Sequence, residues 1–310
     1  MSSLLVAQAL VAPLALFLFA SSASAEPSVY VVSIGPNGPE FGTVNLANGR
    51  FRRIATTQVG DTPMSLNNLI WWHGSLFSLA TADPIAGYLV KIDPATGEIT
   101  VIGATGLGFD AFELAEVNGK LYLTDFNIGG GSQNLYSVDP QTGAATLIGP
   151  TGVPADVIAP FTTNADGTFN LCDESFYGVG GKLYATFDSL NFLPTTLEAD
   201  KYPADPTVSP ALYQIDPSTG STSLIGPTYV YLDASIEVNG TFYAFDGVLT
   251  GFPGGLPAGV SELEKVDLTT GAATFVRVVD DSAGVITGAA PAKRHTDESA
   301  QRQEDAVSPD

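Results

Sequence analysis

Residues 90–106 read VKIDPATGEITVIGATG, and close variants of this stretch return three more times along the chain. They are YSVDPQTGAATLIGPTG from Tyr136, YQIDPSTGSTSLIGPTY from Tyr213 and EKVDLTTGAATFVRVVD from Glu264. Each copy joins two β-forming runs through a segment rich in Asp, Pro and Gly, a pattern typical of two strands joined by a tight turn. A unit repeated at intervals of this length indicates a propeller blade once insertions are allowed.

A second repeated unit lies between these copies. It reads LIWWHGSLFSLA from Leu69, LAEVNGKLYLTD from Leu114, FYGVGGKLYATFD from Phe176 and IEVNGTFYAFD from Ile236. The central Asn-Gly, Gly-Gly and His-Gly pairs suit a hairpin turn with positive φ. Together the two units give four strands per repeat. The sequence therefore predicts four blades, over about residues 65–104, 110–150, 169–227 and 231–280.

A fifth blade is incomplete at the N-terminus. Residues 29–33, 42–46 and 51–55 give three strands, and a segment from 284 to 289 would supply the missing inner strand. Such a strand closes the ring and removes open sheet edges. We therefore predict an all-β fold, a five-bladed β-propeller closed by a C-terminal strand. Six blades is the alternative if residues 150–173 contain a further set of strands.

The phrasing LYxIDPxTGxxTLIGPTG resembles the repeats of secreted bacterial β-propeller proteins, which are related broadly to quinoprotein-like and seven-residue-signature surface propellers. The resemblance covers most of residues 28–290 and implies the fold, while its marked positions are turn formers that imply no chemistry. Quinoprotein dehydrogenases hold their cofactor in a larger ring with tryptophan-rich blades. This chain has only Trp71 and Trp72, so no quinone is expected.

The two ends of the chain differ from the repeats. Residues 1–25 are predicted to be a secretory signal, with an apolar run over 4–20 and the small-residue site Ala23-Ser24-Ala25. The first residues contain no Lys or Arg, so an uncleaved anchor is the alternative. We expect a secreted or periplasmic protein with a propeller over 26–292, no membrane span after cleavage, and a disordered polar tail over 293–310.

Charge and cysteine content restrict the partners. The chain has 12 basic and 33 acidic residues, a net charge of −21, which disfavours nucleic acid and anionic lipid. It is compatible with hard cations, with cationic partners or with simple solubility. Cys172 is the single cysteine, so no intramolecular disulfide forms, and we expect it to behave as a small buried apolar residue.

Connectivity separates the two faces of such a ring. The turns between first and second strands and between third and fourth strands share one face, which carries only tight turns. Second-to-third connections and crossings between blades share the other face, where the long insertions 151–168, 189–209 and 247–260 fall. Functional residues usually lie on loops held by a rigid scaffold, so this second face is the predicted binding face.

Oxygen ligands are predicted to gather on the same face. The carboxylates that follow second strands form the predicted ligand face, Asp83, Asp125, Asp188 and Asp246. The candidate Ca²⁺ ligands come from starts of inner strands and from the stretch NADGTFNLCDE, and are Asp110, Asn164, Asp166, Asn170, Asp173, Glu174 and Asp233. The spacing in that stretch differs from an EF-hand loop, and a solvated acidic rim is the alternative. The aspartates of the DPxTG turns are expected to be structural.

Missing motifs exclude several classes of enzyme. His73 falls in a predicted tight turn and His295 in the tail, so neither a Ser-His-Asp relay nor a multi-histidine zinc or iron site can be assembled. No nucleotide fingerprint occurs, and Gly129-Gly130-Gly131 is an isolated loop run. Neither a nucleotide nor haem is indicated, and the enzymes that remain are based on carboxylates.

Two functions from different classes fit these features. The first is a secreted, non-enzymatic binding module that holds an extracellular glycan, peptide or surface protein through its long loops, with Ca²⁺ as an assisting cation. The second is a carboxylate-dependent extracellular hydrolase or lyase acting on carbohydrate or a lactone. The sequence sets no oligomeric state.

Overall fold

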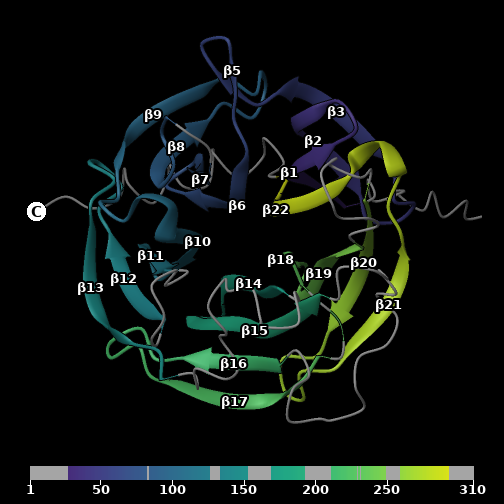
Figure 1. Cartoon of the computed structure of the whole chain (residues 1–310). Helices are drawn as coiled ribbons and strands as arrows, with labels where there is room; N and C mark the ends of the chain where they lie inside the picture. The colour runs from purple at the N-terminus through teal and green to yellow at the C-terminus, as the bar shows by residue number, and fades with distance from the viewer. Residues whose placement is uncertain are drawn as a thin grey trace, which may run out of the picture.

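A computed structural model describes residues 27–81, 84–125, 133–152, 169–192, 211–228, 230, 232–248 and 259–292, with the backbone alone for 169–174, 188–192 and 248. These residues form a ring of five four-stranded antiparallel sheets, which Figure 1 shows along the ring axis. The count of five blades is confirmed, and the six-blade alternative is excluded. The predicted signal segment 1–25 and tail 293–310 lie outside the described residues.

Each blade runs from an inner strand to an outer strand. Blade 1 contains β22 (Val285–Pro291), β1 (Ser28–Gly35), β2 (Gly38–Asn45) and β3 (Phe51–Thr56). Blade 2 contains β6 (Leu66–Trp72), β7 (Ser75–Ala80), β8 (Tyr88–Ile92) and β9 (Ile99–Ala104). Blade 3 contains β10 (Ala111–Val117), β11 (Lys120–Asp125), β12 (Asn134–Val138) and β13 (Ala145–Pro150).

The remaining strands follow the same order. Blade 4 contains β14 (Phe169–Val179), β15 (Lys182–Phe192), β16 (Ala211–Ile215) and β17 (Thr222–Pro227). Blade 5 contains β18 (Ala234–Val238), β19 (Thr241–Val248), β20 (Val260–Val266) and β21 (Ala273–Val278). A small hairpin, β4 (Gln58–Val59) and β5 (Thr62–Pro63), and two 3-10 turns, η1 (Gly108–Asp110) and η2 (Asp281–Ala283), lie in crossings between blades.

The ring is closed by strands from both ends of the chain. The C-terminal β22 pairs antiparallel with β1, in a register that runs from Val29 opposite Pro291 to Ile34 opposite Val285. The inner strand of blade 1 therefore comes from the C-terminus, as predicted, and extends two residues beyond the predicted end at Ala289. In Figure 1 the yellow β22 lies beside the purple β1.

The DPxTG segments form the turns between third and fourth strands. In blade 2 the Oδ1 of Asp93 accepts hydrogen bonds from the N–H groups of Ala95 and Thr96, and the N–H of Gly97 donates to the Asp93 carbonyl. These bonds lower the pKa of Asp93, and the same kind of bonding lowers the pKa of Asp139, Asp216 and Asp267. The predicted structural role of these aspartates is confirmed. In blade 1 Asn45 takes the place of the aspartate.

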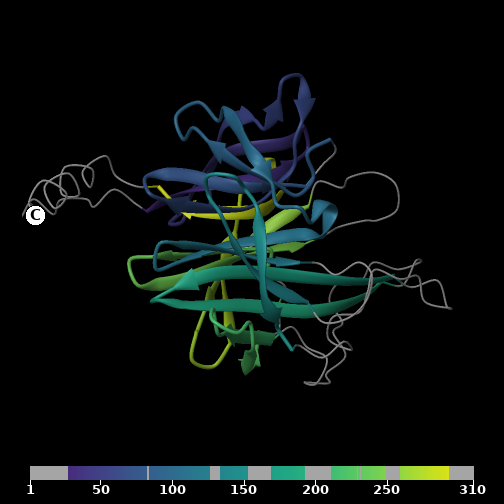
Figure 2. The same ribbon diagram turned by 90° about the vertical axis from the view of Figure 1, so that its left-hand side faces the viewer.

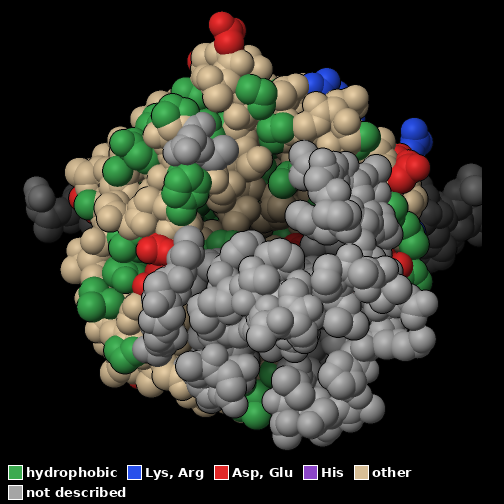
Figure 3. Space-filling view, viewed as in Figure 1, with side chains coloured by type: hydrophobic (Ala, Val, Ile, Leu, Met, Phe, Trp, Pro, Cys, Tyr) green, Lys and Arg blue, Asp and Glu red, His purple; other side chains and the backbone are tan. Residues whose placement is uncertain are grey.

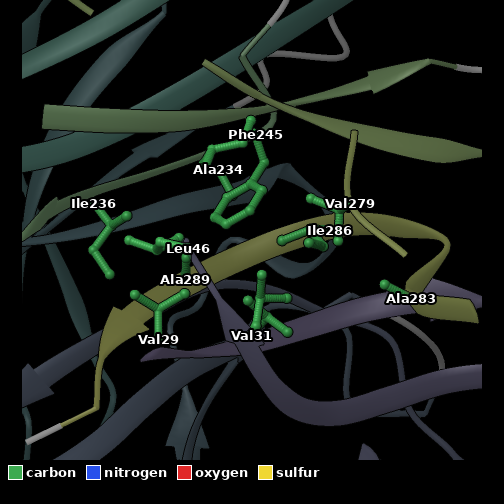
Figure 4. Close-up of a cluster of buried hydrophobic side chains, with 12 residues drawn as sticks. Val29, Val31, Leu46, Ala234, Ile236, Phe245, Val279, Ala283, Ile286 and Ala289 are labelled. Carbon is green, nitrogen blue, oxygen red and sulfur yellow. The ribbon is translucent and has the colours of Figure 1, made fainter. Parts of the chain in front are cut away.

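The core consists of apolar seams between neighbouring blades. Figure 4 shows the seam between blades 5 and 1, where Phe245 and Ile236 meet Val29, Val31 and Ile286. Every one of these five side chains is at most 4% exposed. Burial of apolar area at about 25 cal/mol per Å² is the main favourable term in such a fold, so the seams stabilise the ring as a whole.

Outer strands touch the next blade through glycine. A Cβ on Gly143, in the blade 3 turn, would lie 2.4 Å from the Gly103 carbonyl oxygen in blade 2. Gly220 and Gly149 repeat this contact between blades 4 and 3. The glycine that follows Ile in the repeat is thus explained by the close approach of two backbones, because no side chain fits there.

Candidate functional site

The two faces of the ring differ as predicted. Tight turns join first to second and third to fourth strands on one face, and the described ends of the chain, Pro27 and Ala292, lie there too. The described strand ends that lead into crossings between blades and into second-to-third connections lie on the other face, which we call the loop-bearing face. Figure 2 shows the ring from the side, with the loop-bearing face on the right.

Three pairs of the predicted acidic residues occupy neighbouring backbone positions, one pair in each of blades 3, 4 and 5. In blade 3 Asp110 precedes Ala111, whose Cα partner is Asp125. In blade 5 the N–H of Asp233 donates to the Phe245 carbonyl, next to Asp246. In both blades an acidic residue just before the inner strand lies beside the last part of the second strand, at the loop-bearing face.

The blade 4 pair lies on a longer hairpin. The register places Asp173 of β14 directly opposite Asp188 of β15. Both strands extend past Phe187, the last β15 residue that pairs with β16. Asn170 and Glu174 also lie within β14, so three of the candidate ligands, with Asp173, are on a strand. Like charges directly opposite in a sheet destabilise it unless a cation or protons intervene.

Blade 3 provides the best-defined carboxylate of this face. Asp125 is 5% exposed, and its Oδ1 accepts a hydrogen bond from the N–H of Asn134 at 2.6 Å. Its Oδ2 accepts bonds from the Asn134 side-chain amide and the Tyr136 hydroxyl, both at 2.8 Å. Burial, followed by the bond to Asp125, raises the pKa of Tyr136 to about 12. Both oxygens of the Asp125 carboxylate therefore have hydrogen-bond donors, which fix its orientation. In the neighbouring η1 turn, the Phe109 side chain is 57% exposed.

Blade 5 has an acidic residue at each of the positions that Asp125, Asn134 and Tyr136 occupy in blade 3. They are Asp246, Glu262 and Glu264. Asp246 pairs with Glu262 across β19 and β20, and Glu264 follows two residues later on the same face of the strand. Glu264 is 2% exposed, and burial, with the nearby Glu262 charge, raises its pKa to about 7. The three positions that form a neutral-donor network around one carboxylate in blade 3 therefore hold three carboxyl groups in blade 5.

Some of the predicted site residues and most of the predicted long insertions are not among the described residues. Asp83, Asn164 and Asp166 lie outside the described residues, as do most of the insertions 151–168, 189–209 and 247–260. Where side chains are described, no group of three or more His, Cys, Asp or Glu is arranged to hold a metal ion. Figure 3 shows the loop-bearing face, where the visible acidic side chains lie at separate points of the described surface.

No protein-family model matches this chain, and no curated protein matches it in sequence. Among the described elements there is no helix with the length and apolar composition needed to cross a membrane.

A polar contact at the ring axis was not predicted from the sequence. Asn68, in β6, has φ 55° and is 5% exposed. Its side-chain amide donates to the carbonyls of Leu114 in blade 3 and Phe176 in blade 4. The available signal was Asn67-Asn68 in the middle of an apolar inner strand, since Asn tolerates left-handed backbone better than other residues with a Cβ.

A lateral pocket was also missed. It lies between β3, the β4–β5 hairpin and the Asp93 turn of blade 2, and it is open to solvent. Its lining residues are Ala55, Thr56, Gln58, Gly60, Thr96, Gly97, Glu98 and Ile99. No charged group other than Glu98 lines it, so it lacks the paired carboxylates that distinguish the loop-bearing face.

Proposed function

We propose that this protein is an exported binding propeller that holds an extracellular glycan, peptide or surface protein on its loop-bearing face. The observation that carries the proposal is the asymmetry of the ring, because every connection of variable length falls on that face. The opposite face has tight turns fixed by DPxTG and Asn-Gly chemistry. A rigid scaffold with variable loops on one side is the arrangement that binding proteins use. Export rests on the predicted signal over residues 1–25.

We further propose that Ca²⁺ assists binding at blade 4. The register that sets Asp173 opposite Asp188 supports this, because two adjacent carboxylates repel unless a cation lies between them. Asn164 and Asp166, which precede this hairpin in sequence, are further candidate oxygen ligands. The satisfied Asp125 of blade 3 is a poorer ligand, since three donors already occupy its oxygens.

A carboxylate-dependent hydrolase or lyase is the second candidate. Its support is Glu264, whose pKa is raised to about 7, a value that suits a general acid or base near neutral pH. Glu264 is 2% exposed and lies against a seam between blades, where a polymeric substrate cannot reach it. The geometry therefore favours binding over catalysis.

A glycan array tests the proposal directly. The mature chain from Glu26 is applied to immobilised extracellular polysaccharides and peptides in calcium, and again in chelator. We expect retention that is lost in Asp173→Asn/Asp188→Asn and kept in the opposite-face variant Asp139→Asn. Equal loss of retention in both variants would argue against binding at the loop-bearing face. Release of shortened sugars from the array would favour the hydrolase or lyase instead.

A further inference from the structure

The seam between blades 4 and 5 contains a buried acid to which the described residues provide no compensating partner. This seam is the apolar cluster of Tyr177, Tyr184, Leu212, Leu232, Phe242, Ala244 and Val266. Glu264 pairs with Ala244 and lies two residues from Val266, so its side chain is on the seam face of blade 5. Within the described residues its carboxyl makes no hydrogen bond or ion pair, although the residue is 2% exposed.

Other blades compensate buried acids at the same level of the sheet. In blade 1 Glu40 is 2% exposed and its Oε1 lies 2.9 Å from the Nε of Arg53. In blade 3 Asp125 receives the bonds from Asn134 and Tyr136 described above. Burying a carboxylate without such a partner costs several kcal/mol, and the usual response is to keep the proton. Glu264 is such a buried carboxyl group without a partner among the described residues.

We propose that Glu264 makes the blade 4–5 seam a proton-dependent contact, tight when this carboxyl is protonated and weakened when it is ionised. The groups around it support this. Glu262, two residues earlier on β20, and Asp246, its partner on β19, are acidic and lie on the same face. Blade 4 contributes Tyr177 and Tyr184, whose own pKa values are raised by burial, so neither is charged near neutral pH.

The remaining charged groups near β20 lie elsewhere. Lys265 is the next residue along the strand, is exposed, and therefore points away from the seam. Arg277 of β21 lies beside Gly49 of blade 1, and η2, with Asp281, packs on that same opposite seam. From β21 the residue across from Glu264 is Phe275. No cation of the described elements faces Glu264.

The direction of the effect follows from linkage. The pKa of Glu264 is about 7 in the folded protein against an ordinary 4.5, because burial and Glu262 both disfavour the charged form. Below 4.5 the group is protonated in both folded and unfolded chains. Between 4.5 and 7 the folded protein holds a proton that the unfolded chain has released, so stability falls as pH rises. Above about 7 this contribution levels off.

Thermal unfolding of the full chain at pH 5.5 and pH 8.5 tests the proposal, with Glu264→Gln compared with wild type. From pH 5.5 to pH 8.5 the melting temperature of wild type should fall by at least about 5 °C more than that of Glu264→Gln. At pH 8.5 the variant should melt at a higher temperature than wild type. The matched control Glu40→Gln should lower the melting temperature at both pH values and keep the wild-type difference. Equal pH dependence in wild type and Glu264→Gln would overturn the proposal.

A direct titration covers the case in which the variant folds poorly. The side-chain carboxyl ¹³C shift of Glu264 in the wild-type protein should move with a midpoint near pH 7. A midpoint near the ordinary value of 4.5 would overturn the proposal without any variant.

Discussion

The side-chain amide of Asn68 in blade 2 donates a hydrogen bond of 2.7 Å to the Phe176 carbonyl in blade 4, although blade 3 lies between these two blades in the ring order. The same amide also reaches Leu114 of blade 3. On its other side the Asn68 backbone lies against β22 of blade 1, since a Cβ on Gly288 would be 2.4 Å from the Asn68 carbonyl carbon. One residue therefore links four of the five blades at the ring axis.

Replacing Asn68 tests this link. Asn68→Ala removes both interblade hydrogen bonds and keeps the left-handed backbone, so we expect the free energy of unfolding in urea to fall by about 3 kcal/mol. Asn239→Ala is the control, because Asn239 has a similar φ of 53° in an exposed hairpin turn. We expect that change to cost about 1 kcal/mol, from backbone strain alone. Equal effects of the two substitutions would show that the amide contributes nothing.

The contact between Gly143 and Gly103 gives a second prediction. Gly143→Ala should lower the free energy of unfolding by about 3 kcal/mol, because its Cβ would meet the Gly103 carbonyl and because φ is 80°. Gly240→Ala has a φ of 75° but nothing within 4 Å of its Cβ. Its expected loss is about 1 kcal/mol, from backbone strain alone. Denaturant melts of both variants measure the difference, which would vanish if the two blades did not touch there.

Asp125 and Tyr136 should be coupled in titration. Asp125→Asn removes the negative charge and weakens the hydrogen bond that, after burial, raise the pKa of Tyr136, so this pKa should shift down from about 12. Absorbance at high pH follows it, with Tyr136→Phe used to assign the late-titrating group. An unchanged titration curve in Asp125→Asn would mean that burial alone sets the pKa.

Removal of β22 should open the ring. A chain that ends at Asp281 lacks the partner of β1 and the apolar Ile286 and Ala289 of the blade 5–1 seam. We expect aggregation or a large loss of melting temperature, because an inner sheet edge and part of the core become exposed. A chain that ends at Ala292 is the control and should melt like the full-length protein. Unchanged melting of the shorter chain would contradict closure by β22.

Much of the fold could be read from local sequence. Asp93 and Gly97 specify their turn through bonds within one segment, so every DPxTG copy is correctly placed. The number of blades follows because each repeat supplies four strands. The inner strand of blade 1 was predictable only because the N-terminal segment supplies three strands, one fewer than a blade needs.

Contacts between blades could not be read in the same way. Asn68 finds its acceptors in Leu114 and Phe176, far away in sequence, and a single Asn in an apolar strand does not name them. Glu264 looked like an ordinary member of a repeat, since its burial depends on blade 4. Aligning it with Tyr136 in the repeat would have revealed the unusual acid. The position of Asp110 beside Ala111, the residue that pairs with Asp125, needed the strand register, which composition does not give.

Calorimetric melting of the mature chain in calcium and in chelator tests most directly the claim that the loop-bearing face is a binding face. A ligand that binds only the folded state raises the melting temperature, so we predict an upward shift in calcium. The shift should disappear in Asp173→Asn/Asp188→Asn and persist in Asp139→Asn, which should melt lower in both conditions. No shift in wild type, with the blade 4 variant more stable than wild type, would contradict the account and leave these carboxylates as a solvated acidic rim.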